Sequence, residues 1–265
     1  MTSLDIMRTT HLPTARPLDG MVVIVTGGGR GLGAAISTDA AHAGADVVLV
    51  GRDRGSLESH ARGLQGSPFV CNADLTEAGS ADSIVSAVMG RFGRIDGLVN
   101  NAGSAHFGPA ATISEAEYDA ILALDVRAPL MLAGRAAAAM AHGGSIVNIS
   151  SAMASVGQPG TTLYAASKGA IDAATRSLAA ELGATNVRVN GVRPGLTRTD
   201  ATAYAYQDSA LLNSYHRSVP LGRTGTAHEV AELTTFLLSS AASFITGQTV
   251  TVDGGYTTSK LMNPM

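Results

Sequence analysis

The sequence has little of several things that mark particular classes of protein. It contains one cysteine and no tryptophan, and only 4% of its 265 residues are aromatic and 15% charged. The single cysteine, Cys71, excludes an internal disulfide framework and a cysteine-based zinc site, and the histidines show no metal-ligand spacing, so we expect no metal. With a formal net charge of −3 and no basic run, nucleic acid and an anionic membrane surface are poor partners.

Long apolar runs are absent as well. No run approaches the ~20 residues of a membrane span. The first 19 residues lack the apolar core of a signal peptide. We therefore expect a cytoplasmic protein with no membrane partner.

Short β-branched segments and alanine-rich helical segments alternate along the chain from residue 21 onward, and 45% of the residues are hydrophobic, which excludes general disorder. The predicted strands are Met21–Thr26, Asp46–Val50, Pro68–Cys71, Ile95–Asn100, Ser145–Ile149, Val187–Val192 and Gln248–Val252. The predicted helices are Gly31–Ala43, Asp53–Gly63, Glu77–Phe92, Ser114–Met140 (one long helix or a bent pair), Thr162–Leu182 and Ala227–Leu238.

The strand segments are continuously apolar, which is typical of a parallel sheet covered on both faces. Alternation of seven such strands with helices predicts an α/β fold, a doubly wound seven-stranded parallel Rossmann sheet with helices on both faces. We expect one domain over residues 20–265, preceded by a flexible arm over residues 1–19. The longest irregular segment, Thr197–Thr226, would supply a substrate lid at about residues 196–220.

A glycine-rich segment joins the first predicted strand to the first helix. Residues 26–33 read TGGGRGLG, with the spacing G-x-x-x-G-x-G rather than G-x-G-x-x-G. Glycines at 27, 31 and 33 allow a tight turn and close approach of a pyrophosphate to the backbone and to the helix N-terminus. A glycine turn with no ligand is the alternative, but the position between the first strand and helix favours a dinucleotide.

The charge at the end of the second strand indicates which dinucleotide is bound. The strand ends in Gly51 and Arg52 instead of the acid that would bind the ribose 2′-hydroxyl of NAD. Arg30 lies in the glycine loop, and two guanidinium groups can bind a phosphate in bidentate fashion. The sequence therefore favours NADP(H). NAD(H) remains the alternative, because Asp53 is placed to contact the ribose.

Three polar residues form a second pattern. Tyr164 and Lys168 are four residues apart at the start of a predicted helix and so share one face. A lysine ammonium beside a phenol stabilises the phenolate, so the tyrosine can act as a general acid or base nearer neutral pH. Ser151 follows a strand, at the carboxyl edge where open sheets bind ligands, and its hydroxyl can hold a carbonyl oxygen.

Together these motifs resemble the short-chain dehydrogenase/reductase family over nearly the whole chain, from about Asp19 to Tyr256. The matching motifs are TGGGRGLG, Asn100-Asn101-Ala102-Gly103, Asn148-Ile149-Ser150-Ser151 with Tyr164 and Lys168, Arg193-Pro194-Gly195 with Thr199, and the C-terminal segments Ile245–Gln248 and Val252–Gly255.

The resemblance implies an oxidoreductase that interconverts a ketone or aldehyde and an alcohol by hydride transfer. Tyr164 would move the proton, Lys168 would bind the nicotinamide ribose, and Ser151 would orient the substrate oxygen. Contacts to the cofactor would come from Gly27, Gly29, Arg30, Gly31, Leu32, Gly33, Arg52, Asp74, Leu75, Asn101, Ala102, Gly103, Tyr164, Lys168, Pro194, Gly195, Thr197 and Thr199. Members of the family commonly assemble as tetramers, so we expect a homotetramer or a homodimer.

One position departs from the family pattern. Asp125 stands where the family usually has an asparagine that supports a proton relay to the lysine. We count Asp125 with the catalytic residues, and an ionised carboxylate there would attract Lys168. A harmless replacement is the alternative.

Four residues are candidates for contact with the small-molecule carbonyl or alcohol substrate: His106, Gln158, Tyr204 and Tyr206. The tyrosines of the long segment would either wall an apolar pocket or pack the lid against the body. A cofactor-binding sensor with little redox turnover, motivated by Asp125 alone, is the alternative function, and non-redox chemistry such as dehydration is a third.

Overall fold

The computed structural model describes residues 16–258, which form a central seven-stranded parallel sheet. The strand order is β3 (Phe69–Asn72), β2 (Asp46–Gly51), β1 (Val22–Thr26), β4 (Gly97–Asn100), β5 (Gly144–Ile149), β6 (Val187–Pro194) and β9 (Thr249–Val252). This confirms the predicted doubly wound sheet, whose order reverses between β1 and β4. At such a switch point the loops after the two strands separate and leave room for a ligand.

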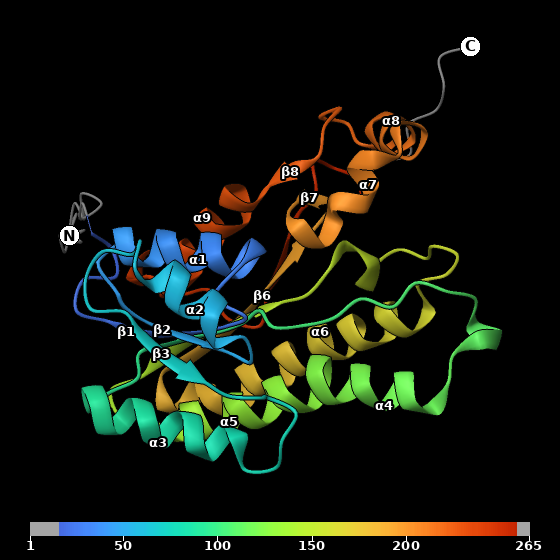
Figure 1. Cartoon of the computed structure of the whole chain (residues 1–265). Helices are drawn as coiled ribbons and strands as arrows, with labels where there is room; N and C mark the ends of the chain where they lie inside the picture. The colour runs from blue at the N-terminus through green and yellow to red at the C-terminus, as the bar shows by residue number, and fades with distance from the viewer. Residues whose placement is uncertain (1–15, 259–265) are drawn as a thin grey trace, which may run out of the picture.

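Helices cover both faces of the sheet (Figure 1). One face carries α1 (Gly31–His42), α2 (Arg54–Ala61) and α9 (Ala227–Leu238), and the other carries α3 (Ser80–Phe92), α4 (Glu115–Leu122), α5 (Ala128–Ala139) and α6 (Thr162–Leu182). Strand β1 shows why its sequence is continuously apolar: Val23 and Val25 enter the core on one face, while Val22 and Ile24 enter the core on the other.

The long predicted helix over residues 114–140 is a bent pair. A π-helical turn, Ala123–Arg127, separates α4 from α5, and Pro129 follows it within the first turn of α5. Proline has no N–H to donate and its ring crowds the carbonyl of the fourth residue before it, which here is Asp125. The wider turn places Asp125 inward, with 1% of its surface exposed.

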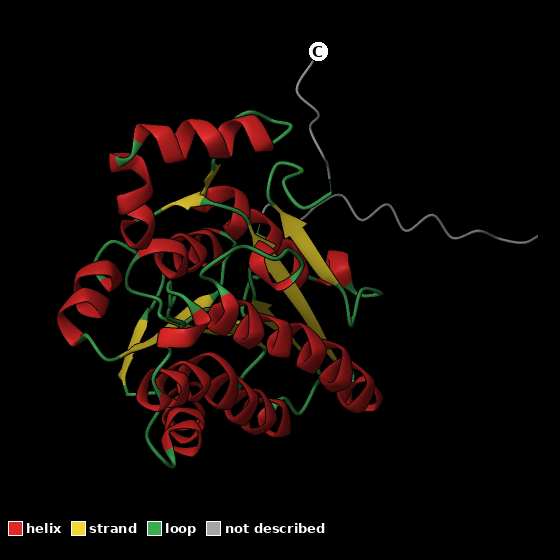
Figure 2. Ribbon diagram, turned by 90° about the vertical axis from the view of Figure 1, so that its right-hand side faces the viewer, coloured by secondary structure: helices red, strands yellow, loops and turns green. Residues whose placement is uncertain are grey.

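The segment predicted to be irregular, Thr197–Thr226, is largely helical, so that prediction was wrong. It contains a 3-10 turn at Asp200–Thr202 and helices α7 (Ala203–Gln207) and α8 (Ser209–Ser218). Its two ends pair as short strands, β7 (Thr197–Arg198) and β8 (Gly225–Thr226). These helices stand beyond the layers of the main sheet in Figure 2. None of the α8 side chains is buried, and polar residues predominate in this short helix, so its sequence gives only a weak signal for a packed helix.

The predicted arm over residues 1–19 lies mostly outside the described residues. Its last part is not loose, because Leu18 is fully buried and its N–H donates to the Ala43 carbonyl at 2.9 Å. Of the helices between residues 16 and 258, none combines the length and apolarity of a transmembrane span.

Candidate active site

The glycine loop after β1 is packed too tightly to accept side chains. Gly27 and Gly31 have φ values of +65° and +57°, in the left-handed region that favours glycine. A Cβ on Gly33 would overlap the Gly27 carbonyl oxygen and lie 2.6 Å from the Asn101 side-chain nitrogen. Arg30, the N-cap of α1, makes no side-chain capping bond, so the first N–H groups of α1 stay available for an anion. The loop therefore fits a dinucleotide pyrophosphate.

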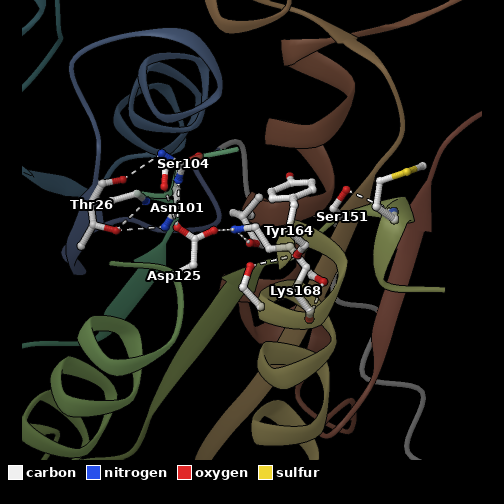
Figure 3. Close-up of polar contacts among 12 residues, drawn as sticks. Thr26, Asn101, Ser104, Asp125, Ser151, Tyr164 and Lys168 are labelled. Carbon is white, nitrogen blue, oxygen red and sulfur yellow. Dashed lines mark hydrogen bonds and ion pairs between the residues drawn. The ribbon is translucent and has the colours of Figure 1, made fainter. Parts of the chain in front are cut away.

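Asn101 joins this loop to the end of β4. Its side-chain amide donates to the Thr26 carbonyl at 2.8 Å, and its backbone N–H donates to the Thr26 hydroxyl at 2.9 Å. Ala102 N–H also donates to that hydroxyl, at 3.0 Å. These bonds join the end of β1 to the segment after β4, on the two sides of the switch point (Figure 3).

Basic residues lie at the end of β2. The Arg52 guanidinium is 74% exposed and lies 3.9 Å from the Asp74 carboxylate. Hydrogen bonds from Thr76, and to a lesser extent the nearby Arg52, hold the pKa of Asp74 below its usual value. The Asp53 carboxylate accepts a hydrogen bond from Ser56 N–H at 3.1 Å and so caps α2.

Three of the four predicted catalytic residues, Ser151, Tyr164 and Lys168, lie close together in one cleft (Figure 3). The Lys168 ammonium lies 5.8 Å from the centre of the Tyr164 ring, and both residues come from the first turns of α6. Ser151 follows β5; its hydroxyl oxygen accepts from Met153 N–H at 3.2 Å, which leaves the hydroxyl proton free to donate. A phenol, an ammonium and a hydroxyl thus meet at the carboxyl edge of the sheet.

Asp125 forms a buried ion pair with Lys168. Its carboxylate lies 3.2 Å from the ammonium, and the two side chains are 0% and 7% exposed. The second carboxylate oxygen accepts from Ser104 N–H at 2.8 Å. A Cβ on Gly103 would lie 3.0 Å from the ammonium, so glycine there leaves room for the pair. Lys168 also donates to the Ile149 carbonyl at 3.4 Å.

A single cleft of about 700 Å³ gathers these groups. Every residue predicted to contact the cofactor lines it, from Gly27 and Arg52 at one end to Thr199 at the other, and so do Ser151 and Tyr204. Asp125 lies behind Lys168 and does not line the cleft. Phe107 also lines the cleft but was not among the predicted substrate residues; it lies in the loop after Asn100–Gly103, where no spacing rule indicates which side chain faces the cleft.

Three predicted substrate residues do not line the cleft. His106 points to Glu117, with 3.6 Å between its Nδ1 and the carboxylate. Gln158 is exposed on the loop before α6. The Tyr206 ring packs under the Arg198 guanidinium at 5.3 Å. Tyr215 packs the long segment against the body, because its hydroxyl accepts from Leu196 N–H at 2.9 Å. The tyrosines of this segment thus divide between the two roles considered above.

Comparisons with known proteins agree with this site. A family model described as enoyl-(acyl carrier protein) reductase matches residues 27–257. A 3-oxoacyl-(acyl-carrier-protein) reductase from Chlamydia pneumoniae is 37% identical over 246 residues, covering 91% of this chain and 98% of the relative. A short-chain dehydrogenase/reductase structure from Mycobacterium ulcerans has a TM-score of 0.88 at 35% identity, covering 91% of this chain and 90% of that one. A gluconate 5-dehydrogenase structure from Burkholderia cenocepacia, in complex with NADP and tartrate, has a TM-score of 0.88 at 29% identity, covering 93% and 98%.

The chain belongs to the short-chain dehydrogenase/reductase family, a class of nicotinamide-dependent oxidoreductases that interconvert CH–OH and C=O groups. The names of these relatives refer to substrates as different as an acyl carrier protein and gluconate. Membership therefore gives the reaction class, and the substrate has to be inferred from the cleft itself.

Proposed function

We propose that the protein is an NADP(H)-dependent reductase, or dehydrogenase in the reverse direction, that interconverts a small ketone or aldehyde and its alcohol. The observation that carries the proposal is the convergence of Ser151, Tyr164 and Lys168 with the glycine loop in one cleft. The intact trio also argues against a sensor without turnover and against dehydration, neither of which requires all three groups.

In this proposal the bound nicotinamide supplies or accepts the hydride, and the protein handles the proton. In reduction, the Tyr164 hydroxyl gives its proton to the substrate oxygen as the carbonyl carbon receives the hydride; in oxidation the phenolate takes the proton back. Ser151 donates a hydrogen bond to the same oxygen and stabilises its developing negative charge. The Lys168 ammonium stabilises the phenolate left on Tyr164.

The cofactor preference rests on the end of β2. No acid occupies position 51, and Arg30 and Arg52 both line the cleft. The carboxylate that could favour NAD, Asp53, is already engaged as the cap of α2. A guanidinium binds a phosphate dianion through charge-assisted hydrogen bonds. The end of β2 is therefore better suited to the 2′-phosphate of NADP than to the ribose 2′-hydroxyl of NAD.

Replacement of the tyrosine tests the function directly. Tyr164→Phe keeps the ring but removes the transferable proton, so we expect NADPH-dependent reduction of a ketone to fall by about 10²- to 10⁴-fold. The dissociation constant of NADPH, measured by titrating its fluorescence, should change little, since the loss is in proton transfer. A variant that keeps full turnover would refute the proposal.

We further propose that the protein is cytoplasmic and assembles as a homotetramer or homodimer. Apolar side chains are exposed on the edge strand β9, in the segment that leads into it, and on α9: Val250, Phe244 and Phe236 are 37%, 103% and 40% exposed. Water-exposed apolar groups gathered near a sheet edge are typical of surfaces that pair with another chain. Sedimentation equilibrium measures the number of 26.8 kDa chains per particle.

A further inference from the structure

One aromatic side chain, Phe107, lies beside Tyr164, and a second from a distant part of the sequence, Tyr204, lies beside Phe107. The Phe107 ring centre is 6.1 Å from that of Tyr164 and also 6.1 Å from that of Tyr204. Phe107 and Tyr204 are 55% and 50% exposed, and both line the cleft. In a chain with few aromatic residues, two large rings are thus left open to water next to the proton donor.

Hydrogen bonds to the backbone hold the segments that carry these rings. Gly108 N–H donates to the Gly160 carbonyl at 2.9 Å, which joins the Phe107 loop to the loop before α6. The Thr202 hydroxyl donates to the Thr197 carbonyl at 2.7 Å and so fixes the start of α7, which carries Tyr204. The rings are therefore spaced before any substrate arrives, and less ordering is needed on binding.

The part of the cleft beside Phe107 and Tyr204 differs in charge from the part beside the glycine loop, where the cofactor would bind. The basic residues lining it are Arg30 and Arg52, near the glycine loop, and Lys168, which is paired with Asp125. The charged lining residue of the long segment, Asp200, is an acid. Within residues 16–258 the lining therefore offers an anionic substrate no uncompensated cation beside the rings, and a carboxylate or phosphate would lose hydration without gaining a partner.

We propose that the substrate is an uncharged aryl ketone or aldehyde, or the matching aryl carbinol, and that Phe107 and Tyr204 select it through contacts between rings. The proposal rests on the proposed function, since the carbonyl oxygen must reach Tyr164 and Ser151. Aromatic rings pair best in offset or edge contacts with centres about 4.5–7 Å apart, the separation at which Phe107 already holds its two neighbours. An aryl group attached to the carbonyl carbon covers the exposed rings and keeps the reacting atoms beside the phenol.

Three ketones of related size test this assignment in NADPH-dependent reduction. Acetophenone has the ring, cyclohexyl methyl ketone has the same carbons without a planar ring, and 4-acetylbenzoate adds a carboxylate. The variants Phe107→Leu and Tyr204→Leu remove a ring, while Phe107→Tyr and Tyr204→Phe keep it and serve as matched controls. We expect kcat/KM to be highest for acetophenone. Each leucine variant should lower the ratio of kcat/KM for acetophenone to that for the cyclohexyl ketone by about two- to tenfold, and the controls should preserve it.

Other results would overturn the assignment in distinguishable ways. If the leucine variants leave that ratio unchanged, or if the native protein prefers 4-acetylbenzoate, the aryl selection is wrong. In that case, loss of the same activity in Tyr164→Phe would show that the proposed function still holds. If none of the three ketones is reduced with NADPH or NADH, the substrate assignment fails; the proposed function fails as well only if a panel of aliphatic ketones and aldehydes also goes unreduced.

Discussion

The two ends of the cleft differ in what lines them. We call the part beside the glycine loop and Arg52 the cofactor end, and the part beside Phe107 and Tyr204 the substrate end. At the cofactor end, the glycines at 27, 29, 31 and 33 leave backbone uncovered beside the side chains of Arg30 and Arg52. At the substrate end, the side chains of Phe107, from a loop, and Tyr204, from α7 almost a hundred residues later, lie together. The pyrophosphate is the same in every nicotinamide dinucleotide, so backbone N–H groups are enough to bind it. Substrates differ from one enzyme to another, so their recognition requires side chains that can differ between relatives.

The largest effect should come from adding one carbon at the cofactor end. A Cβ in Gly33→Ala overlaps the Gly27 carbonyl oxygen, and neither backbone segment can yield without opening the loop. We expect the dissociation constants of NADPH and NADH to rise together, by up to about a hundredfold, as measured by fluorescence titration.

The control for that variant is Gly90→Ala in α3, where the added carbon meets nothing within 4 Å. An alanine there should leave cofactor binding intact and raise the free energy of unfolding by about 0.5–1 kcal/mol. Normal cofactor binding by Gly33→Ala would show that the cofactor end does not depend on bare backbone.

A smaller effect should follow from removing a charge at the same end. Arg52→Ala should raise the dissociation constant of NADPH by roughly tenfold or more, because a charge-assisted bond to the 2′-phosphate is lost, and should change that of NADH little. Arg54→Ala is the matched control, since Arg54 is two residues away, pairs with Glu58 at 2.8 Å and lies outside the cleft. Equal weakening of both cofactors by Arg52→Ala would contradict the NADP(H) assignment.

The smallest effect concerns Asp125, which lies behind Lys168 and does not itself line the cleft. In the native protein its carboxylate offsets the positive charge that Lys168 presents to Tyr164, and the other contact of the ammonium, the Ile149 carbonyl, carries no net charge. Asp125→Asn leaves that positive charge uncompensated, so the negative charge on the Tyr164 oxygen that alcohol oxidation requires is better stabilised. The rising limb of the pH profile for alcohol oxidation should move down by about one pH unit.

Asp172→Asn is the control for this shift. Asp172 lies one turn beyond Lys168 on α6 and pairs with Arg193 at 2.8 Å outside the cleft. Its replacement should destabilise the fold, as expected when a buried pair is broken, without moving the pH profile. An unchanged profile in Asp125→Asn, measured beside this control, would support the harmless replacement considered from the sequence.

Most of the sheet could be predicted because its strands are buried on both faces and therefore continuously apolar. Helices α6 and α9 occur with the predicted bounds, since their apolar residues recur with helical spacing. The prediction failed over Thr197–Thr226, where α8 buries no side chain. The π-helical turn also went unpredicted: Pro129 indicates a bend between the two helices, but not whether the preceding turn widens or breaks.

By itself the sequence determined the fold class, the glycine loop and the spacing of Tyr164 and Lys168, because each depends on residues close together in the chain. The tertiary structure decided that Asp125 pairs with Lys168, that His106 points away to Glu117, and that Phe107 lies beside both Tyr164 and Tyr204. Those contacts join segments that only the packed sheet and its connecting loops bring together, and no local pattern records the direction in which a loop side chain points.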